Sequence, residues 1–113
     1  NKSFGAESFD ITPVNFCALR SCRGICKNKR VTITGIADFN AAEYDLTAFC
    51  AAKIPSAYAP KALTPIFARN GSASVTRVYV ADIYTNGDIM FVINGALTEA
   101  TKSIVFSVTY DID

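Results

Sequence analysis

Every second residue is apolar along several stretches of this chain, and this alternation constrains the fold more than any other feature. The clearest case is residues 103–110. One face there carries Ile104, Phe106, Val108 and Tyr110, and the other carries Ser103, Ser107 and Thr109 together with Val105. Because side chains of a β-strand point alternately to its two faces, the pattern predicts a half-buried strand.

Two further strands are predicted directly upstream. Residues 88–94 alternate in the same way, and their second face is also partly apolar, which predicts a strand covered on both sides. The dipeptide Asn86-Gly87 supplies residues that tolerate positive φ and links this segment to residues 76–84 as a hairpin. We therefore expect 76–84, 88–94 and 103–110 to be successive neighbours in a meander.

A second hairpin is predicted nearer the N-terminus. Residues 30–36 alternate cleanly, and the polar turn at 27–29 separates them from an apolar run over 14–25. Gly35 lies inside the strand pattern, where a glycine typically marks a bulge or a bend.

Residues 40–53 fit either a helical turn followed by helix or strand, or a loop followed by a short strand. The loop and strand are favoured, because the segment ends at Ile54-Pro55 without a helix C-cap. Pro55, Pro60 and Pro65 then predict an extended crossing segment, since proline cannot donate a hydrogen bond within a central strand. A turn is expected at 70–72.

These segments amount to about seven or eight short strands, a number typical of an antiparallel β-sandwich. The length of 113 residues predicts a single domain over 1–113. A hydrophobic content of 50% excludes a disordered chain, and the net charge of +1 gives no reason to expect nucleic acid as a partner. No stretch approaches the ~18 apolar residues of a membrane span, so membrane insertion is not expected. The chain does not begin with Met, and we expect it to be the C-terminal part of a longer protein.

The four cysteines leave three alternatives open. In an extended strand Cys22 and Cys26 lie about 13 Å apart, too far to bridge or to share one tetrahedral metal. Cys17 is subject to the same limit, whereas Cys50 could pair with one of the three across strands. We favour free, mostly buried thiols over one or two disulfides and over a metal site.

The chain contains no His, which removes the usual base of nucleophilic and metal-assisted catalysis. Paired carboxylates are the remaining candidates for catalysis, and they would come from Asp82, Asp88, Asp111 and Asp113. Solvated acids at strand ends explain these residues more simply. We therefore predict that the protein is not an enzyme and uses no cofactor.

Two groups of side chains are candidates for ligand binding. The first is a basic cluster that could hold an acidic polymer or simply be a solvated hairpin tip; it comprises Lys27, Lys29 and Arg30, with Arg20 and Arg23 nearby. The second is a set of tyrosines that could stack on sugar rings or lie in the core: Tyr44, Tyr58, Tyr79 and Tyr84. Tyr44, inside the polar loop 40–45, is the best candidate for exposure.

Residues 54–110 carry a series of short motifs in order. The series runs Ile54-Pro55-Ser56-Ala57-Tyr58-Ala59-Pro60, then Arg77-Val78-Tyr79-Val80, then Asn86-Gly87-Asp88-Ile89, then a closing strand ending at Tyr110. This series resembles the C-terminal head domains of bacteriophage receptor-binding proteins and tail fibres. The upstream segment 27–35 fits the earlier part of such a head. Ala59 departs from the family pattern, in which Arg often precedes the second proline.

The resemblance implies a jelly-roll-like sandwich, assembled as a homotrimer at a tail tip or baseplate of a virion. It implies binding to a host cell-surface saccharide, with stalk or baseplate proteins upstream as further partners. No binding residue carries over by motif. We take as candidate ligand-binding residues Tyr44 and Asp45 in the polar loop, and Arg69 and Asn70 at the predicted turn.

The apolar second faces of 14–25 and 88–94 independently predict a contact between subunits. Two other functions stay open. A structural module of a virion or appendage would bind only protein partners. A small glycan hydrolase would use a pair of the carboxylates named above.

Overall fold

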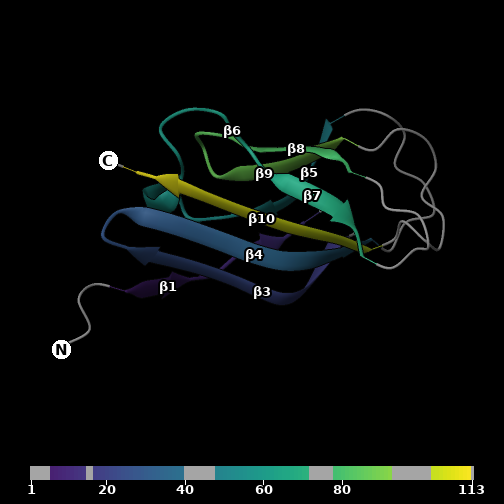
Figure 1. The fold of residues 1–113 in the computed structure, drawn as a ribbon, viewed down its shortest axis with the longest axis horizontal. Coiled ribbons are helices and arrows are strands. Elements are labelled where there is room, and N and C mark those ends of the chain that lie inside the picture. The colour runs from purple at the N-terminus through teal and green to yellow at the C-terminus, as the bar shows by residue number, and fades with distance from the viewer. Residues whose placement is uncertain (1–5, 15–16, 40–47, 72–77, 93–102, 113) are drawn as a thin grey trace.

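The computed structural model of this chain describes residues 6–14, 17–39, 48–71, 78–92 and 103–112. Two antiparallel sheets of five strands each pack face to face (Figure 1). The first sheet has the order β1-β3-β4-β10-β7 and the second the order β2-β5-β9-β8-β6. The predicted antiparallel β-sandwich is therefore confirmed. Strands far apart in the sequence are neighbours in both sheets, as they are in jelly-roll sandwiches.

The strands of the first sheet are β1 (Glu7–Phe9), β3 (Cys17–Lys27), β4 (Arg30–Phe39), β7 (Phe67–Asn70) and β10 (Ser103–Asp111). Those of the second are β2 (Thr12–Pro13), β5 (Ala48–Lys53), β6 (Thr64–Pro65), β8 (Val80–Ile83) and β9 (Asp88–Val92). The described residues thus form ten strands rather than seven or eight. The strands that were not predicted as such are β1, β2 and β6, of two or three residues each, and β7, of four, and these are too short for an alternating pattern to be visible.

The predicted meander is wrong in its last step. β8 and β9 form the expected hairpin, and Gly87 has the positive φ of 95° that its turn requires. β10, however, lies in the other sheet, between β4 and β7. Alternation in the sequence predicts which residues of a strand face the core, but it does not predict which other strand lies beside that strand. Ten residues, 93–102, separate β9 from β10, more than a tight hairpin needs.

The predicted N-terminal hairpin is confirmed as β3 and β4. The irregularity expected at Gly35 lies on the opposite strand, where the register shifts between Arg20 and Arg23. Ser21, with a φ of 50°, and Cys22 are the residues in this bulge. A Cβ atom on Gly35 would lie 2.7 Å from the Sγ of Cys22, so the glycine leaves room for the bulge.

The short strand expected before the prolines is confirmed as β5, whereas the preceding loop lies outside the described residues. Pro55 precedes a single 3-10 turn, η1 (Ser56–Tyr58). Pro65 lies in β6, an edge strand of the second sheet, where a missing N–H group is tolerated. The described part of the chain holds no helix with the length and apolar character of a transmembrane span.

The core lies between the two sheets. Its largest fully buried side chains belong to strands of both sheets and are Phe91, Phe106, Ile33, Ile83, Ile89, Ile104 and Val31. The ring of Phe91 makes edge-to-face contacts with Phe39, Phe49 and Phe106 at centroid distances of 6.0, 6.4 and 5.7 Å. Such pairs add about 0.5–1.5 kcal/mol each beyond the area they bury. On β10, the four residues predicted to face inward are all buried.

Candidate functional site

A depression of about 770 Å³ lies at the tip of the β3–β4 hairpin, beside the end of β10. Its lining comprises Lys27, Asn28, Lys29, Arg30, Thr32 and Asp111. Arg30 and Asp111 are paired across β4 and β10, and the Nε of Arg30 lies 3.1 Å from a carboxylate oxygen of Asp111. The described lining therefore has three cations, on Lys27, Lys29 and Arg30, and one carboxylate, which is paired with the guanidinium of Arg30. The depression has a positive charge excess suited to an anionic group.

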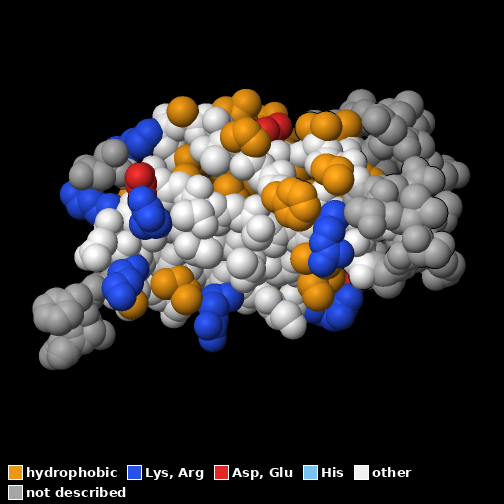
Figure 2. Space-filling model, in the orientation of Figure 1, with side chains coloured by type: hydrophobic (Ala, Val, Ile, Leu, Met, Phe, Trp, Pro, Cys, Tyr) orange, Lys and Arg blue, Asp and Glu red, His pale blue; other side chains and the backbone are white. Residues whose placement is uncertain are grey.

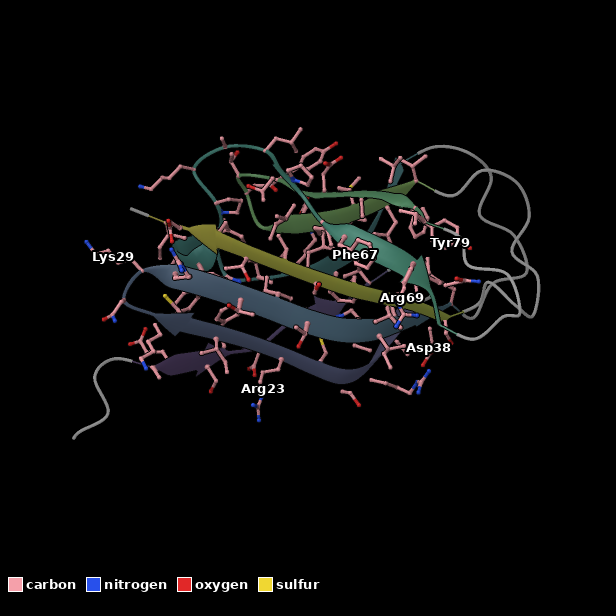
Figure 3. The ribbon with its side chains drawn as sticks, in the orientation of Figure 1. Arg23, Lys29, Asp38, Phe67, Arg69 and Tyr79 are labelled. Atoms are coloured by element: carbon pink, nitrogen blue, oxygen red, sulfur yellow. The ribbon has the colours of Figure 1, made fainter. Side chains whose placement is uncertain are left out.

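The backbone holds this hairpin tip in a defined shape. Asn28 and Lys29 both have positive φ, 52° and 64°, as the two central residues of a type I′ turn do. Glycine is the preferred residue at the second position, because an L-residue there costs about 1–2 kcal/mol. The N–H of Ile112 also donates to the carbonyl of Lys29, at 2.9 Å, which ties the end of β10 to the tip. Lys29 is labelled at this end of the molecule in Figure 3.

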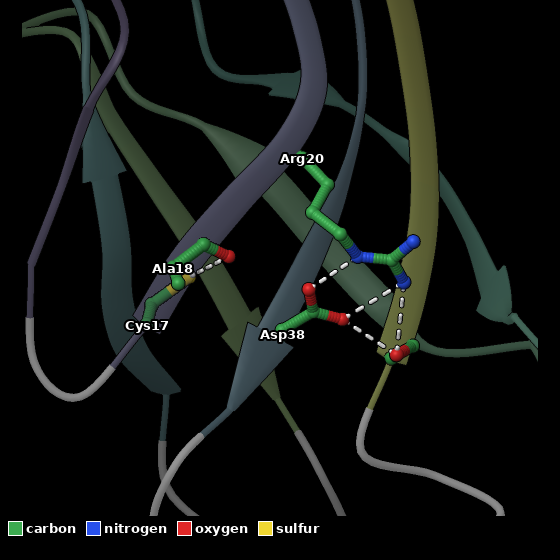
Figure 4. Close-up of polar contacts among 5 residues, drawn as sticks. Cys17, Ala18, Arg20 and Asp38 are labelled. Carbon is green, nitrogen blue, oxygen red and sulfur yellow. Dashed lines mark hydrogen bonds and ion pairs between the residues drawn. The ribbon is translucent and has the colours of Figure 1, made fainter.

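The other two arginines of the predicted basic cluster do not join this site. Arg20 lies toward the opposite end of the first sheet, where it forms an ion pair with Asp38 (Figure 4). Ser103 donates to the same carboxylate at 2.6 Å, so the contact connects β3, β4 and β10. Hydrogen bonding from Arg20 lowers the pKa of Asp38 and, reciprocally, raises the pKa of Arg20. Arg23 is exposed on the outer face of the sheet, opposite Thr34.

The candidate ligand residues named from the sequence are only partly described. Tyr44 and Asp45 lie outside the described residues. Arg69 and Asn70 end β7 and point to opposite faces, so Arg69 is half-buried at the surface and Asn70 is buried with 4% exposure. The side chain of Arg69 donates to the carbonyl of Asn70 at 3.1 Å. Neither residue lines the depression at the hairpin tip.

Two of the other tyrosines have structural contacts. Tyr58 stacks on Phe9 of β1 with ring centroids 4.4 Å apart, and its hydroxyl donates to Glu7. That hydrogen bond raises the pKa of Tyr58. Tyr79 is half-buried against the core. Tyr84 is the most exposed of the four described tyrosines, with 39% of its surface accessible.

The candidate catalytic acids are engaged with cations or lie apart from the depression. Asp88 accepts a hydrogen bond from Lys53 at 2.9 Å and is also held by Asn86. Asp82 is on the outer face of the second sheet, and Asp113 is outside the described residues. Among the described residues, Asp111 supplies the single carboxylate of the depression, and none of these residues brings a second carboxyl group to it.

All four cysteines are free thiols, as favoured from the sequence, but fewer of them are buried than expected. Cys26 is buried and the other three are half-buried. Burial is the main reason that the pKa of Cys17 rises to about 12, and it also raises the pKa of Cys22 and of Cys50. Within the described ranges, no group of cysteine, aspartate and glutamate residues is arranged to hold a metal ion.

The sequence reveals part of this site. The positions of Lys27, Lys29 and Arg30 around a polar turn are visible in it, and so is Asn28 between them. Thr32 and Asp111 were missed as members, because their place beside the tip depends on the pairing of β4 with β10, two segments about 80 residues apart in the sequence.

Comparison of the chain with protein-family models gives no match, and comparison with curated proteins gives none either.

Proposed function

We propose that this domain is a receptor-binding head of a bacteriophage tail fibre or baseplate and that it binds an anionic host cell-surface saccharide without catalysing a reaction. The observation that carries the proposal is the depression at the hairpin tip, whose described lining has three cations and one carboxylate. The sandwich fold and the motif series in residues 54–110 support the choice of a phage head domain, at the tail tip of the virion.

The chemistry of the lining fits a saccharide that bears phosphate or carboxylate groups. The ammonium groups of Lys27 and Lys29 are donors for the anionic group. The side-chain amide of Asn28 and the hydroxyl of Thr32 both donate and accept, so they match the hydroxyl groups of a sugar. The exposed lining makes this a shallow site, which suits one segment of a polymer rather than an enclosed small molecule.

Lys29 supports this proposal independently of the charge count. It occupies a left-handed backbone position at which glycine would be more stable by roughly 1 kcal/mol. The backbone conformation therefore does not explain a lysine at this position, whereas a binding role for its ammonium group does.

Lys29→Gly separates binding from folding. We expect the variant to be as stable as the unsubstituted domain, or more stable by up to about 1 kcal/mol, while losing a ligand contact. Binding would be measured with phosphorylated dextran at low salt, with unmodified dextran as the neutral comparison. The expected loss is about two- to five-fold for one exposed charge, and it should diminish as salt is added.

Lys61→Gln is the matched control, because it removes one exposed positive charge outside the lining. Equal losses for the two variants would mean that binding follows net charge and not the site. Unchanged binding by Lys29→Gly would reject the site as well. Retention of the labelled domain on intact cells from a panel of Gram-positive bacteria then tests the adhesin function.

A structural virion or appendage module is the second candidate, and the exposed apolar side chains within 63–67 and 78–84 favour it. That function predicts assembly with protein partners and no retention on cells or on phosphorylated dextran. A glycan hydrolase is disfavoured, and we expect no release of reducing ends from cell-wall polysaccharide.

A further inference from the structure

Five large apolar side chains are exposed on neighbouring stretches of the described chain. They are Leu63 (59% exposed), Phe67 (57%), Val78 (69%), Val80 (61%) and Tyr84 (39%). Figure 2 shows hydrophobic side chains gathered over β6, β7 and β8. The two segments predicted from the sequence to contact another subunit, 14–25 and 88–94, contribute none of these side chains.

One unbroken ribbon of two strands carries these side chains. Thr64 pairs with Ile83, and the same register continues to Arg69, which pairs with Val78. Backbone hydrogen bonds of 2.9 Å from Ile66 to Ala81 and from Tyr79 to Ala68 lie between those pairs. Residues 64–69 therefore stay paired with 78–83 while they cross from the second sheet to the first. We call the outward side of residues 63–69 and 78–84 the ribbon face.

Two charged residues of the ribbon face lie on opposite strands and toward opposite ends. Arg69 is paired with Val78 at one end, and Asp82 is paired with Pro65 toward the other. The shared register puts Phe67 opposite Val80, midway between them. Within the described part of the chain, neither Arg69 nor Asp82 forms an ion pair. The face thus has an apolar centre with one cation and one anion at equal distances from it.

We propose that the ribbon face binds a second copy of this chain through a two-fold axis that passes between Phe67 and Val80. Such an axis brings Arg69 onto the partner's Asp82 and Asp82 onto the partner's Arg69, so each charge meets an opposite one. Phe67 then lies against its own counterpart. The strands of the two copies cross at a shallow angle, as they do in packed sheets.

The size of the face sets the strength of this contact. The paired ribbon is six residues long, or about 20 Å, and only two strands wide. This is less than the roughly 800 Å² per partner of a standard interface, so the pair is expected to dissociate in the micromolar range. The inference does not depend on the proposed saccharide binding, because it uses a different surface.

Sedimentation equilibrium of the purified domain tests the proposal directly. The mass should rise from that of one chain, 12.2 kDa, toward two chains between about 1 µM and 1 mM. A mass of one chain throughout would overturn the proposal. A plateau at three chains, the number that the resemblance to phage heads implies, would overturn the two-fold arrangement. The proposal would also be overturned if the domain alone kept the mass of one chain and a different protein bound it through this face.

Charge reversal separates the proposed contact from a loss of folding. Arg69→Glu and Asp82→Lys should each weaken self-association at least about ten-fold, because each puts like charges in contact. An equimolar mixture of the two variants should recover the two-chain mass, since opposite charges would then meet at both ends of the contact. Arg23→Glu, on the outer face away from the ribbon, is the matched control and should leave the mass unchanged. Failure of the mixture to recover, with both variants folded by circular dichroism, would refute the pairing.

Discussion

Replacing Gly35 by Ala tests how closely the β3 bulge packs on β4. The new Cβ atom would lie 2.7 Å from the Sγ of Cys22, 3.1 Å from its Cβ and 3.2 Å from its Cα. The thiol can rotate away, but the positions of the other two atoms are fixed by a backbone that the bulge holds in place. Overpacking of this kind costs about 1–3 kcal/mol, and we expect about 2 kcal/mol here.

A double-mutant cycle with Cys22→Ala identifies the source of that loss. The second substitution removes the sulfur but leaves the two carbon atoms nearest to position 35, so Gly35→Ala should cost only about 1 kcal/mol in that background. Urea unfolding followed by circular dichroism gives all four free energies, and Cys22→Ala alone provides the baseline. Equal costs in both backgrounds would refute the role of the sulfur. No cost in either would refute the close packing of the bulge.

Three further predictions concern a turn, an ion pair and the thiols. Gly87→Ala should lower stability by about 3 kcal/mol in a thermal melt, because Gly87 has a φ of 95° and its new Cβ would lie 2.5 Å from the carbonyl oxygen of Ile54; a neutral result would contradict the turn. The lowered pKa of Asp38 means that its carboxylate stabilises the fold above an unfolded pKa of about 4 and ceases to do so as the pH falls through the lower folded value. Urea midpoints of Asp38→Asn and the unsubstituted domain should therefore differ at neutral pH and converge in strong acid; a constant difference would contradict this. Because burial raises the pKa of Cys17 to about 12, alkylation of this thiol at pH 8 should be slow in the folded domain. After denaturation all four thiols should be alkylated, as mass spectrometry would show. Fewer than four alkylated thiols would indicate a disulfide.

The sequence predicts the faces of the strands better than their neighbours. Alternation at 103–110 correctly places the inward residues of β10, because burial acts on each side chain separately. It does not tell that β10 lies between β4 and β7, since that depends on contacts between distant segments. The two hairpins were predicted correctly, because positive φ at a turn is a local property of residues such as Asn28 and Gly87.

For the candidate site, too, the sequence predicts what neighbouring residues determine and not what depends on contacts between distant segments. The three cations of the hairpin tip are close in the sequence, and their clustering was visible there. The carboxylate of Asp111 that faces them is not close in the sequence, and it reaches the site through the pairing of β10 with β4. The ribbon face could not be predicted for a similar reason. In the sequence, the odd positions of 63–69 resemble ordinary strand residues. They face outward because the two strands cross between the sheets, and the sequence pattern does not predict that crossing.

The ribbon that crosses between the sheets also determines where the sandwich can open. Hydrogen bonds join the two layers along the side formed by residues 64–69 and 78–83, whereas the opposite side ends in β1 and β2, of three and two residues. Fluctuations that part the layers should therefore begin at the N-terminal side and reach the ribbon last. Amide protons of Ile66 and Tyr79 should exchange with deuterium only through global unfolding, and those of β1 and β2 through local motion.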